Sequence, residues 1–462
     1  MTGIPANASD RKPVLNLSSV IYNGTLYEQV YNPKTSQSSF IGWDTNKQEL
    51  IAIDYLEDSD FKYAPINDEL LQKGAVLLPS DAIDYGNEEE LEIEIESYLQ
   101  TWVDVSEEHL QKAVWYAFLT RLTDNINTIP YLRALGDTGT GKTRYLDTIG
   151  GICYKPMFVG GAVNSAPIFR IIDKWRGTAI FDEFNLKKSD DSENIIQILN
   201  NGYQRGKPVL RCQDGNYENV KPFDAFCPKI LATRDRFRDK ALESRCLTEI
   251  LTTTSRNDIP IDLTQKFFDK RGELQNKLLM YRFKHWDTVD TDAMINIDFG
   301  ENVLPRIKQA HAPFTVLFLD NKERLSEFIR YTQKVNNKII EENSMSFEGQ
   351  IINAYIHLLE EHEMEQQTLD DHKEPVITST DVKDHLVNVE GWDADKLKTS
   401  TIGRKIRTLG FGVTPKSIAG KTKRVITIDD DKLEKLKQKY VITTITDITL
   451  HTDEVINDKL SD

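Results

Sequence analysis

The chain has 462 residues and a formal net charge of −16, and this length leaves room for about two to four domains with a large core. No apolar run approaches the roughly 18 residues of a membrane-spanning helix. The polar start at residues 1–10 lacks the apolar core of a signal peptide. The four cysteines show no C-x-x-C spacing, which argues against a zinc site or a disulfide framework. Together these features predict a cytoplasmic protein with no membrane partner.

Charge is distributed unevenly along the chain. Residues 1–100 hold 6 basic and 18 acidic side chains, whereas residues 130–262 hold 20 basic and 17 acidic ones. Residues 396–428 contain nine basic side chains and no acidic one. A purely basic segment in an acidic chain predicts a polyanionic partner for that segment.

The first hundred residues are predicted to form a small, strand-rich acidic N-terminal domain. Short apolar runs at residues 20–22, 40–43 and 50–53 are separated by Asn, Gly, Asp and Pro, which favour turns. An acidic run then opens a helix that we expect to reach Trp102. A second helix is expected over residues 109–122, where apolar residues recur with a helical period.

Residues 101–262 alternate between apolar strands and amphipathic helices, which predicts an α/β fold with a parallel sheet. A β-hairpin is expected over residues 207–225, because Asp214-Gly215-Asn216 is a strong turn signal. The expected strands lie at 131–135, 157–160, 178–181 and 229–232, and the expected helices at 143–149, 168–175 and 192–201.

The remaining chain is predicted to be a helical lid over residues 263–375, a further domain over 376–440 and a flexible tail over 441–462. Long helices are expected in the lid at 304–318, 322–343 and 347–367. In the following domain we expect helices at 378–386, 395–397 and 399–409 and a hairpin at 413–428.

The most informative motif is the phosphate-binding loop pattern G-x-x-x-x-G-K-[ST] at residues 136–143. Its glycines allow backbone N–H groups to point at phosphate oxygens, while the lysine adds positive charge and the last hydroxyl can bind Mg²⁺. An expected strand precedes the loop and an expected helix follows it, which argues against an ordinary glycine-rich turn. The sequence therefore predicts binding of ATP and Mg²⁺ by Gly136, Asp137, Thr138, Gly139, Thr140, Gly141, Lys142 and Thr143.

A second motif is the apolar strand that ends in Asp182-Glu183. We expect Asp182 to hold Mg²⁺ through water and Glu183 to orient the attacking water. The alternative is a pair of solvated carboxylates at a strand end, which is common when no phosphate loop precedes it.

Residues 110–375 resemble the AAA+ superfamily of ATPases. The strand that ends in Thr233 is similar to the sensor 1 strand, although Asn is more usual there. The segment 241–246, Ala-Leu-Glu-Ser-Arg-Cys, is similar to the segment that carries the arginine finger, so the resemblance implies that Arg245 acts on a neighbouring subunit. The helix that begins near Arg306 resembles sensor 2 and would reach the phosphates from the lid. Arg234, Arg236 and Arg238 are alternatives to Arg245.

Within this superfamily the chain looks like the minichromosome-maintenance-like helicases and the primase-associated helicases of viruses and plasmids. The resemblance rests on two features: the hairpin placed before the sensor 1 strand, and the segment of residues 199–209, where a helix runs into a strand. It implies that the hairpin moves nucleic acid through the channel of a ring. Lys207, Arg211 and Lys221 are the expected contacts, and a solvated structural hairpin is the alternative.

The basic segment near the C-terminus is predicted to be a winged helix, because helix, helix, basic helix and basic hairpin follow one another in that order. Winged helices also bind proteins, so a protein-interaction module is the alternative. The expected nucleic-acid contacts are Arg404, Lys405, Arg407, Lys421, Lys423 and Arg424.

Together these features predict an ATP-dependent DNA helicase or translocase that forms a homo-oligomeric, hexameric ring and works in DNA replication with a primase or another replication protein. Two alternatives remain open at this stage. One is an AAA+ switch or loader that binds DNA and recruits another machine without unwinding. The other is a signalling or defence nucleotidase.

Overall fold

A computed structural model describes residues 12–160, 165–182, 190–213, 216–369, 375–418 and 421–441. Packing divides the chain into two compact units. The first unit runs to Ile297 and also takes in Gln309–Leu325, and the second contains Asp298–Lys308 and the chain from Ser326 onward. This division crosses the predicted range 263–375, whereas the range 376–440 lies wholly within the second unit. Both domain assignments stay predictions, and each unit is described below by itself.

The centre of the first unit is a five-stranded sheet with the strand order β14-β8-β13-β10-β9. Every pairing in it is parallel, which confirms the predicted α/β fold with a parallel sheet. β13 lies between β8 and β10 although it follows both in the chain. The carboxyl ends of these three strands therefore lie side by side. The strands are β8 (Tyr131–Leu135), β9 (Met157–Val159), β10 (Ala179–Phe181), β13 (Lys229–Thr233) and β14 (Cys246–Ile250).

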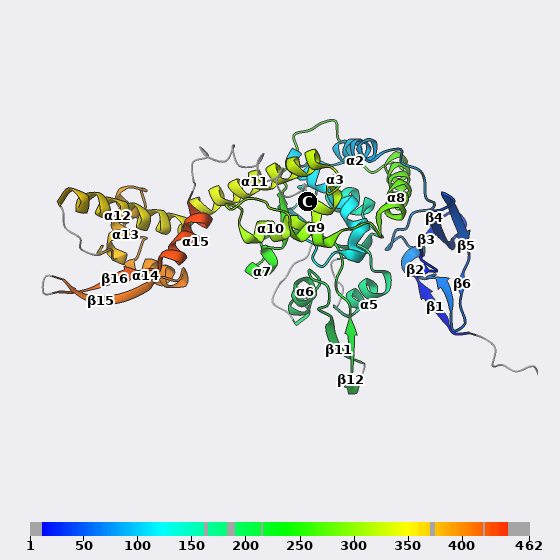
Figure 1. The fold of residues 1–462 in the computed structure, drawn as a ribbon, viewed down its shortest axis with the longest axis horizontal. Coiled ribbons are helices and arrows are strands. Elements are labelled where there is room, and N and C mark those ends of the chain that lie inside the picture. The colour runs from blue at the N-terminus through cyan, green and yellow to red at the C-terminus, as the bar shows by residue number, and fades with distance from the viewer. Residues whose placement is uncertain are drawn as a thin grey trace, which may run out of the picture. The chain divides into compact units, whose positions relative to one another are not determined.

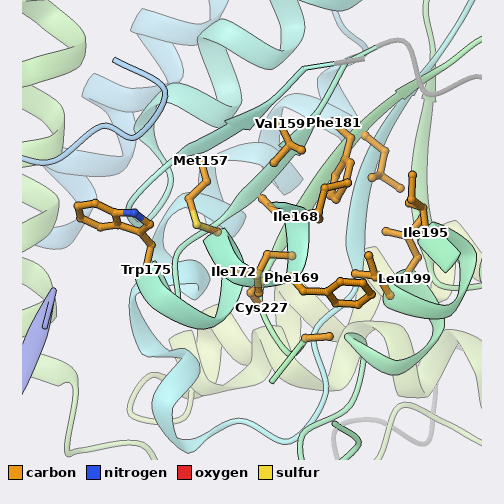
Figure 2. Packing of buried hydrophobic residues seen from close by; sticks show 14 of the residues in the cluster. Met157, Val159, Ile168, Phe169, Ile172, Trp175, Phe181, Ile195, Leu199 and Cys227 are labelled. Atoms are coloured by element: carbon orange, nitrogen blue, oxygen red, sulfur yellow. The ribbon is translucent and has the colours of Figure 1, made fainter. Parts of the chain in front are cut away.

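Helices link these parallel strands, as a parallel sheet requires. They are α4 (Lys142–Ile149), α5 (Ser165–Trp175) and α6 (Asp190–Asn201). Figure 2 shows apolar side chains of α5 and α6 packed with those of β9 and β10, among them Ile168, Leu199 and Phe181. Burial of this surface stabilises the sheet at about 25 cal/mol per Å² of apolar area.

The N-terminal strands form two further sheets in the first unit, with the orders β2-β3-β4-β5 and β1-β7-β6. They are β1 (Val14–Leu17), β2 (Ser19–Tyr22), β3 (Thr25–Asn32), β4 (Gln37–Asp44), β5 (Glu49–Ile53), β6 (Leu56–Glu57) and β7 (Lys62–Pro65), followed by the short helix α1 (Glu69–Gln72).

A buried ion network joins the N-terminal strands to the rest of the first unit. Glu28 of β3 is 1% exposed and lies 2.7 Å from the ammonium of Lys155 and 2.6 Å from the guanidinium of Arg282. Burial alone would raise the pKa of Glu28, but these two cations outweigh burial and hold that pKa below its ordinary value. Removing one member of such a network typically costs about 3–5 kcal/mol. The strands are therefore fastened to the core rather than loosely attached.

Further helices surround the core of the first unit. The helix expected to reach Trp102 is present as α2, and Asn87 caps it by accepting from the N–H of Glu90. Among the described residues, no helix is long and apolar enough to cross a bilayer. The helices are α2 (Glu88–Trp102), α3 (Glu107–Leu119), η1 (Thr120–Asn125), η2 (Gly150–Ile152), α7 (Lys240–Glu243), α8 (Gln265–His285), α9 (Thr291–Ile295) and η3 (Ala312–Leu317).

The second unit has its own core, in which Ile351 and Tyr355 of α12 pack with Leu386, Ile402 and Ile406 from the following helices. Its elements are α10 (Pro305–His311, up to Lys308), α11 (Lys322–Met345, from Ser326 onward), α12 (Phe347–Leu369), α13 (Ser379–Asn388), α14 (Thr399–Thr408), β15 (Gly412–Ile418), β16 (Lys421–Thr427) and α15 (Asp430–Tyr440).

The helix expected at residues 395–397 is wrong, because the chain makes a turn there. The carboxylate of Asp393 accepts from the N–H of Asp395 at 3.0 Å, and its carbonyl accepts from the N–H of Leu397 at 3.0 Å. An aspartate that bonds its own downstream backbone favours a turn over a helix. α15 was not expected, and Asp429 caps its first turn.

Candidate functional site

Three features predicted from the sequence meet at the carboxyl edge of the parallel sheet. The phosphate-loop sequence follows β8, Asp182 follows β10, and Thr233 ends β13. The N–H of Gly136 donates to the carbonyl of Thr233 at 3.1 Å, and the hydroxyl of Thr143 donates to a carboxylate oxygen of Asp182 at 3.2 Å. Segments that are far apart in the sequence thus converge on one small region.

The glycines of the loop are required by its backbone. Gly139 and Gly141 have φ values of +81° and +88°, a region that residues with a Cβ atom rarely adopt. A Cβ on Gly136 would lie 2.6 Å from the carbonyl oxygen of Leu251. The loop ends at the first turn of α4, where unpaired N–H groups and the helix dipole favour an anion.

The loop lysine is held close to the loop itself. The ammonium of Lys142 donates to the carbonyls of Gly136 at 2.9 Å and Asp137 at 2.6 Å, and the residue is only 5% exposed. The side chain therefore folds back over the preceding residues, and its charge lies at the phosphate loop.

Two oxygen atoms at this edge are buried without a hydrogen-bond partner in the described part of the chain. They are Oδ1 of Asp182 and Oγ1 of Thr233. An unpaired buried polar group costs about 1–3 kcal/mol, so such atoms are suited to a partner supplied from outside the protein. A carboxylate and a hydroxyl are also the oxygen ligands that Mg²⁺ prefers, so Asp182 and Thr143 fit that ion.

The described residues contain no group of three or more His, Cys, Asp and Glu side chains that could hold a metal alone.

A buried arginine on β8 anchors the segment that leads to Arg245, and sequence reasoning missed it. The guanidinium of Arg133 is fully buried and bonds both carboxylate oxygens of Glu243 at 2.6 Å. Burial alone would raise the pKa of Glu243, but Arg133 outweighs it and that pKa lies below its ordinary value. The only signal in the sequence was one charged residue inside an apolar strand.

The predicted arginine finger is engaged within its own chain. The guanidinium of Arg245 donates to the side-chain oxygen of Asn200 on α6, and it lies over the ring of Tyr203 at 5.3 Å. Among the alternatives, Arg236 pairs with Glu243 at 3.2 Å and Arg238 is exposed.

The structure leaves two predicted catalytic residues untested. Glu183 lies outside the described residues. Arg306 lies in the first turn of α10, in the part of that helix that belongs to the second unit. Their roles stay predictions.

The predicted hairpin is present as β11 (Val209–Gln213) and β12 (Asn216–Phe223), and it extends past α5 and α6 in Figure 1. Lys207 and Lys221 are exposed. Arg211, in contrast, donates to Asn194 at 2.9 Å and lies over the ring of Phe169 at 4.7 Å. The structure therefore places the Arg211 side chain against α5 and α6. The turn residues 214 and 215 lie outside the described residues.

The predicted contacts near the C-terminus differ among themselves. Arg404, Arg407, Lys423 and Arg424 are exposed. Lys405 instead pairs with Glu348 at 2.8 Å. The side chain of Lys421 lies outside the described residues.

No family model and no curated protein matches this chain. Among solved structures, the chain is similar to the NrS-1 C-terminal region, residues 305–718, in its apo form. The TM-score is 0.35 at 12% identity, over 87% of this chain and 96% of that one. A second form of the same region has a TM-score of 0.36 at 10% identity over the same shares.

The JCV helicase with a bound thiazolopyridine acetamide compound has a TM-score of 0.26 at 14% identity, over 55% of this chain and 62% of that one. TM-scores this low support no conclusion about fold or function.

Proposed function

We propose that this protein is an ATP-hydrolysing motor that acts on nucleic acid, as a ring-forming helicase or translocase in DNA replication. The observation that carries the proposal is the meeting of Thr143, Asp182 and Thr233 beside the loop at one edge of the sheet. Two of these residues present buried oxygens that have no partner in the described chain.

In this proposal the backbone N–H groups of the loop and the ammonium of Lys142 bind the phosphates. Asp182 and Thr143 would hold Mg²⁺, whose charge would offset that of the phosphates. Thr233 would donate a hydrogen bond to the terminal phosphate or to the attacking water, and Glu183 would orient that water.

Arg245 is proposed to act on the active site of a neighbouring subunit, which makes the working form a homo-oligomer. To do so its guanidinium must leave Asn200 and Tyr203. The test mixes Arg245→Ala subunits with Lys142→Ala subunits, each inactive alone. Recovery of ATP turnover at intermediate ratios is expected, and turnover that stays at zero across all ratios contradicts action between subunits.

The nucleic-acid contacts are proposed to come from two places. Lys207 and Lys221 lie on or beside the first hairpin and are exposed. The succession of α13, α14, β15 and β16 is proposed to be a winged helix.

An ATP-dependent switch or loader is a second candidate, and one observation favours it. Arg211, a predicted grip on the hairpin, is already engaged by Asn194 and Phe169. A hairpin with fewer available cations is less suited to pulling a strand.

The deciding experiment measures ATP turnover with and without single-stranded DNA, together with strand displacement on forked DNA. The Glu183→Gln variant is the control, and we expect it to bind ATP but hydrolyse it slowly. Strand displacement that requires turnover supports the motor. Turnover stimulated by DNA without displacement supports the switch, and absence of any turnover contradicts both.

A further inference from the structure

The four-stranded sheet of the N-terminal strands ends in a free edge at β5. Among the described residues, β5 pairs with β4 alone, in an unbroken antiparallel register. A strand that is paired on one side only directs its remaining N–H and C=O groups outward, where they have no ladder partner. The edge can therefore accept one further strand.

The composition of β5 does not protect this edge. Natural edge strands are commonly blunted by Lys, Pro or a β-bulge, whereas β5 reads Glu-Leu-Ile-Ala-Ile and keeps a regular register. Leu50 is 38% exposed, and Glu49 and Ala52 are exposed as well. An apolar edge that stays open favours pairing with another chain, so it is a candidate for a specific use.

The two faces of β5 differ in what they contact. Ile51 and Ile53 pack against the buried cluster around Phe40, so they point to the core. Leu50 and Ala52 alternate with them and therefore point to the opposite face. A side chain of an added strand that stood opposite Leu50 would share this second face with it.

A hollow of about 650 Å³ lies beside Leu50. Trp43 of β4 stands directly opposite Leu50 in the ladder, and both side chains line the hollow together with Ala82 and with Met280 of α8. This lining is largely apolar, and the volume is within the range of roughly 300–1,000 Å³ typical of ligand sites. The hollow can therefore accept a large apolar side chain from an added strand.

Charge at this edge favours a basic partner. Glu49 begins β5, Asp54 follows it, and both are exposed. The one nearby ammonium, that of Lys47, lies 3.5 Å from Glu49, and a surface ion pair of this kind contributes little. The first hundred residues hold 18 acidic and 6 basic side chains. A positively charged segment is thus attracted to the N-terminal strands.

A second copy of this chain fits the edge less well. If β5 paired with itself in antiparallel fashion around Ile51, Glu49 of each copy would lie beside Asp54 of the other. Like charges in such positions destabilise strand pairing, and two acidic regions would be brought together. The edge therefore favours a partner of opposite charge.

We propose that the free edge of β5 and the hollow beside Leu50 form a docking site for an extended, positively charged segment of a partner protein. The segment pairs with β5 as a fifth strand of the sheet, and one large apolar side chain enters the hollow. Main-chain hydrogen bonds supply affinity, while the hollow and the acidic edge supply specificity. This gives the acidic N-terminal strands a role that is independent of the proposed ATP-driven activity.

The test uses the full-length chain and short synthetic peptides as probes. The probe peptides alternate Lys with Val and carry Leu, Phe or Trp at the centre. One control peptide replaces Val by Pro, which removes N–H donors, and another replaces Lys by Glu. Fluorescence anisotropy measures binding, and hydrogen exchange reports on residues 49–53. We expect a probe peptide to slow exchange there, and both control peptides to bind at least about tenfold more weakly.

Leu50→Lys is the matching variant of the protein, because it removes an apolar wall of the hollow and places a positive charge at the edge. It should weaken binding of the probe peptide by at least about tenfold. Ile21→Lys is the matched control, since Ile21 is 58% exposed on β2, at the opposite edge of the same sheet. This control should bind as the wild type does, and both variants should keep its thermal unfolding.

Four outcomes overturn the proposal. Equal binding of the Pro peptide, or of the probe to Leu50→Lys, shows attraction by charge alone. Self-association of the protein that Leu50→Lys abolishes identifies a second copy as the occupant. Slow exchange throughout β5 in the free monomer shows that another segment of the same chain pairs with this edge. Absence of binding by every probe peptide up to about 1 mM removes the site. Each of these results leaves the proposed motor standing, because turnover and strand displacement test it separately.

Discussion

The two basic hairpins of this protein look alike in sequence but differ in what their cations contact. In the β11–β12 hairpin, Arg211 is engaged by Asn194 and by the ring of Phe169. In the β15–β16 hairpin, Lys423 and Arg424 are exposed beside a hollow. A basic residue on a hairpin strand is therefore structural or available depending on which helix packs beside it.

The neighbouring elements explain the difference. α5 and α6 pack against the first hairpin and present an aromatic ring and an amide oxygen to β11. The start of α13 lies against β16 and presents hydroxyl groups. An aromatic ring attracts a cation without neutralising its charge, whereas hydroxyl groups leave the cation free to bind phosphate.

The largest expected effect is on ATP turnover. It tests whether DNA binding, which we assign to the second hairpin, depends on the ATP site. Lys142→Ala should lower ATP turnover by on the order of 100-fold or more, because a preorganised positive charge is lost at the phosphates. DNA binding without nucleotide, which we assign to the second hairpin, should not change. ATP turnover and equilibrium DNA binding are measured side by side, with Lys174→Ala as control because Lys174 pairs with Asp68 at the surface. Normal turnover in Lys142→Ala would remove the loop from the mechanism.

The next effect concerns the exposed lysines at the first hairpin. Lys207→Ala with Lys221→Ala should reduce strand displacement by roughly tenfold, because two phosphate contacts are lost. Basal ATP turnover should stay the same, since neither lysine lies at the sheet edge. Lys73→Ala is the control, as Lys73 pairs with Glu69 on a distant helix. Undiminished displacement would make this hairpin a structural element only.

A direct comparison of Arg211→Ala with Arg424→Ala tests the contrast itself. Arg211→Ala should lower the free energy of unfolding by about 1–3 kcal/mol, because Asn194 loses its donor and Phe169 its cation. Arg424→Ala should change it by less than about 0.5 kcal/mol but reduce the salt dependence of DNA binding. Urea unfolding and salt titrations measure both. Equal losses in the free energy of unfolding in the two variants would contradict the proposed difference between the two hairpins.

The smallest expected effect is a loss of stability in acid, which originates in the first unit. Burial, with a smaller contribution from Lys112, holds the pKa of His109 well below its ordinary value. The unfolded chain therefore binds this proton more readily, and stability falls as pH decreases through about 6.5. At one pH unit below this value, the loss in the free energy of unfolding reaches about 1.4 kcal/mol.

His109→Gln keeps a polar partner for the hydroxyl of Tyr145, which lies 2.7 Å from the His109 ring nitrogen. Unfolding in urea at several pH values should show a flatter pH dependence in that variant. An identical acid response in the variant and the wild type would rule out His109 as the cause.

The edge of the parallel sheet could be predicted because its parts are encoded locally. Gly139 and Gly141 are needed for a left-handed backbone, and a strand precedes both the loop and Asp182. Parallel strands bring their carboxyl ends to one edge, so the contact between Thr143 and Asp182 follows from the motifs together.

The partners of buried charges could not be predicted in the same way. Arg133 bonds Glu243, and Glu28 meets Arg282, across long stretches of chain. Any acidic residue could have filled these positions, because local sequence does not say which distant segment packs alongside. The helix expected at 395–397 was wrong for a local reason, since Asp393 holds a turn there.

The amino-acid sequence by itself determined the phosphate-binding loop, the alternation of strands and helices, and the positive segment near the C-terminus. These depend on backbone preferences and composition within a few residues. Only the tertiary structure decided that the N-terminal strands are fastened to the core through Glu28, that Arg211 and Arg245 are engaged within the chain, and that Arg407 and Lys423 share one hollow. The physical reason is that a side chain's partner comes from whichever segment the fold brings beside it.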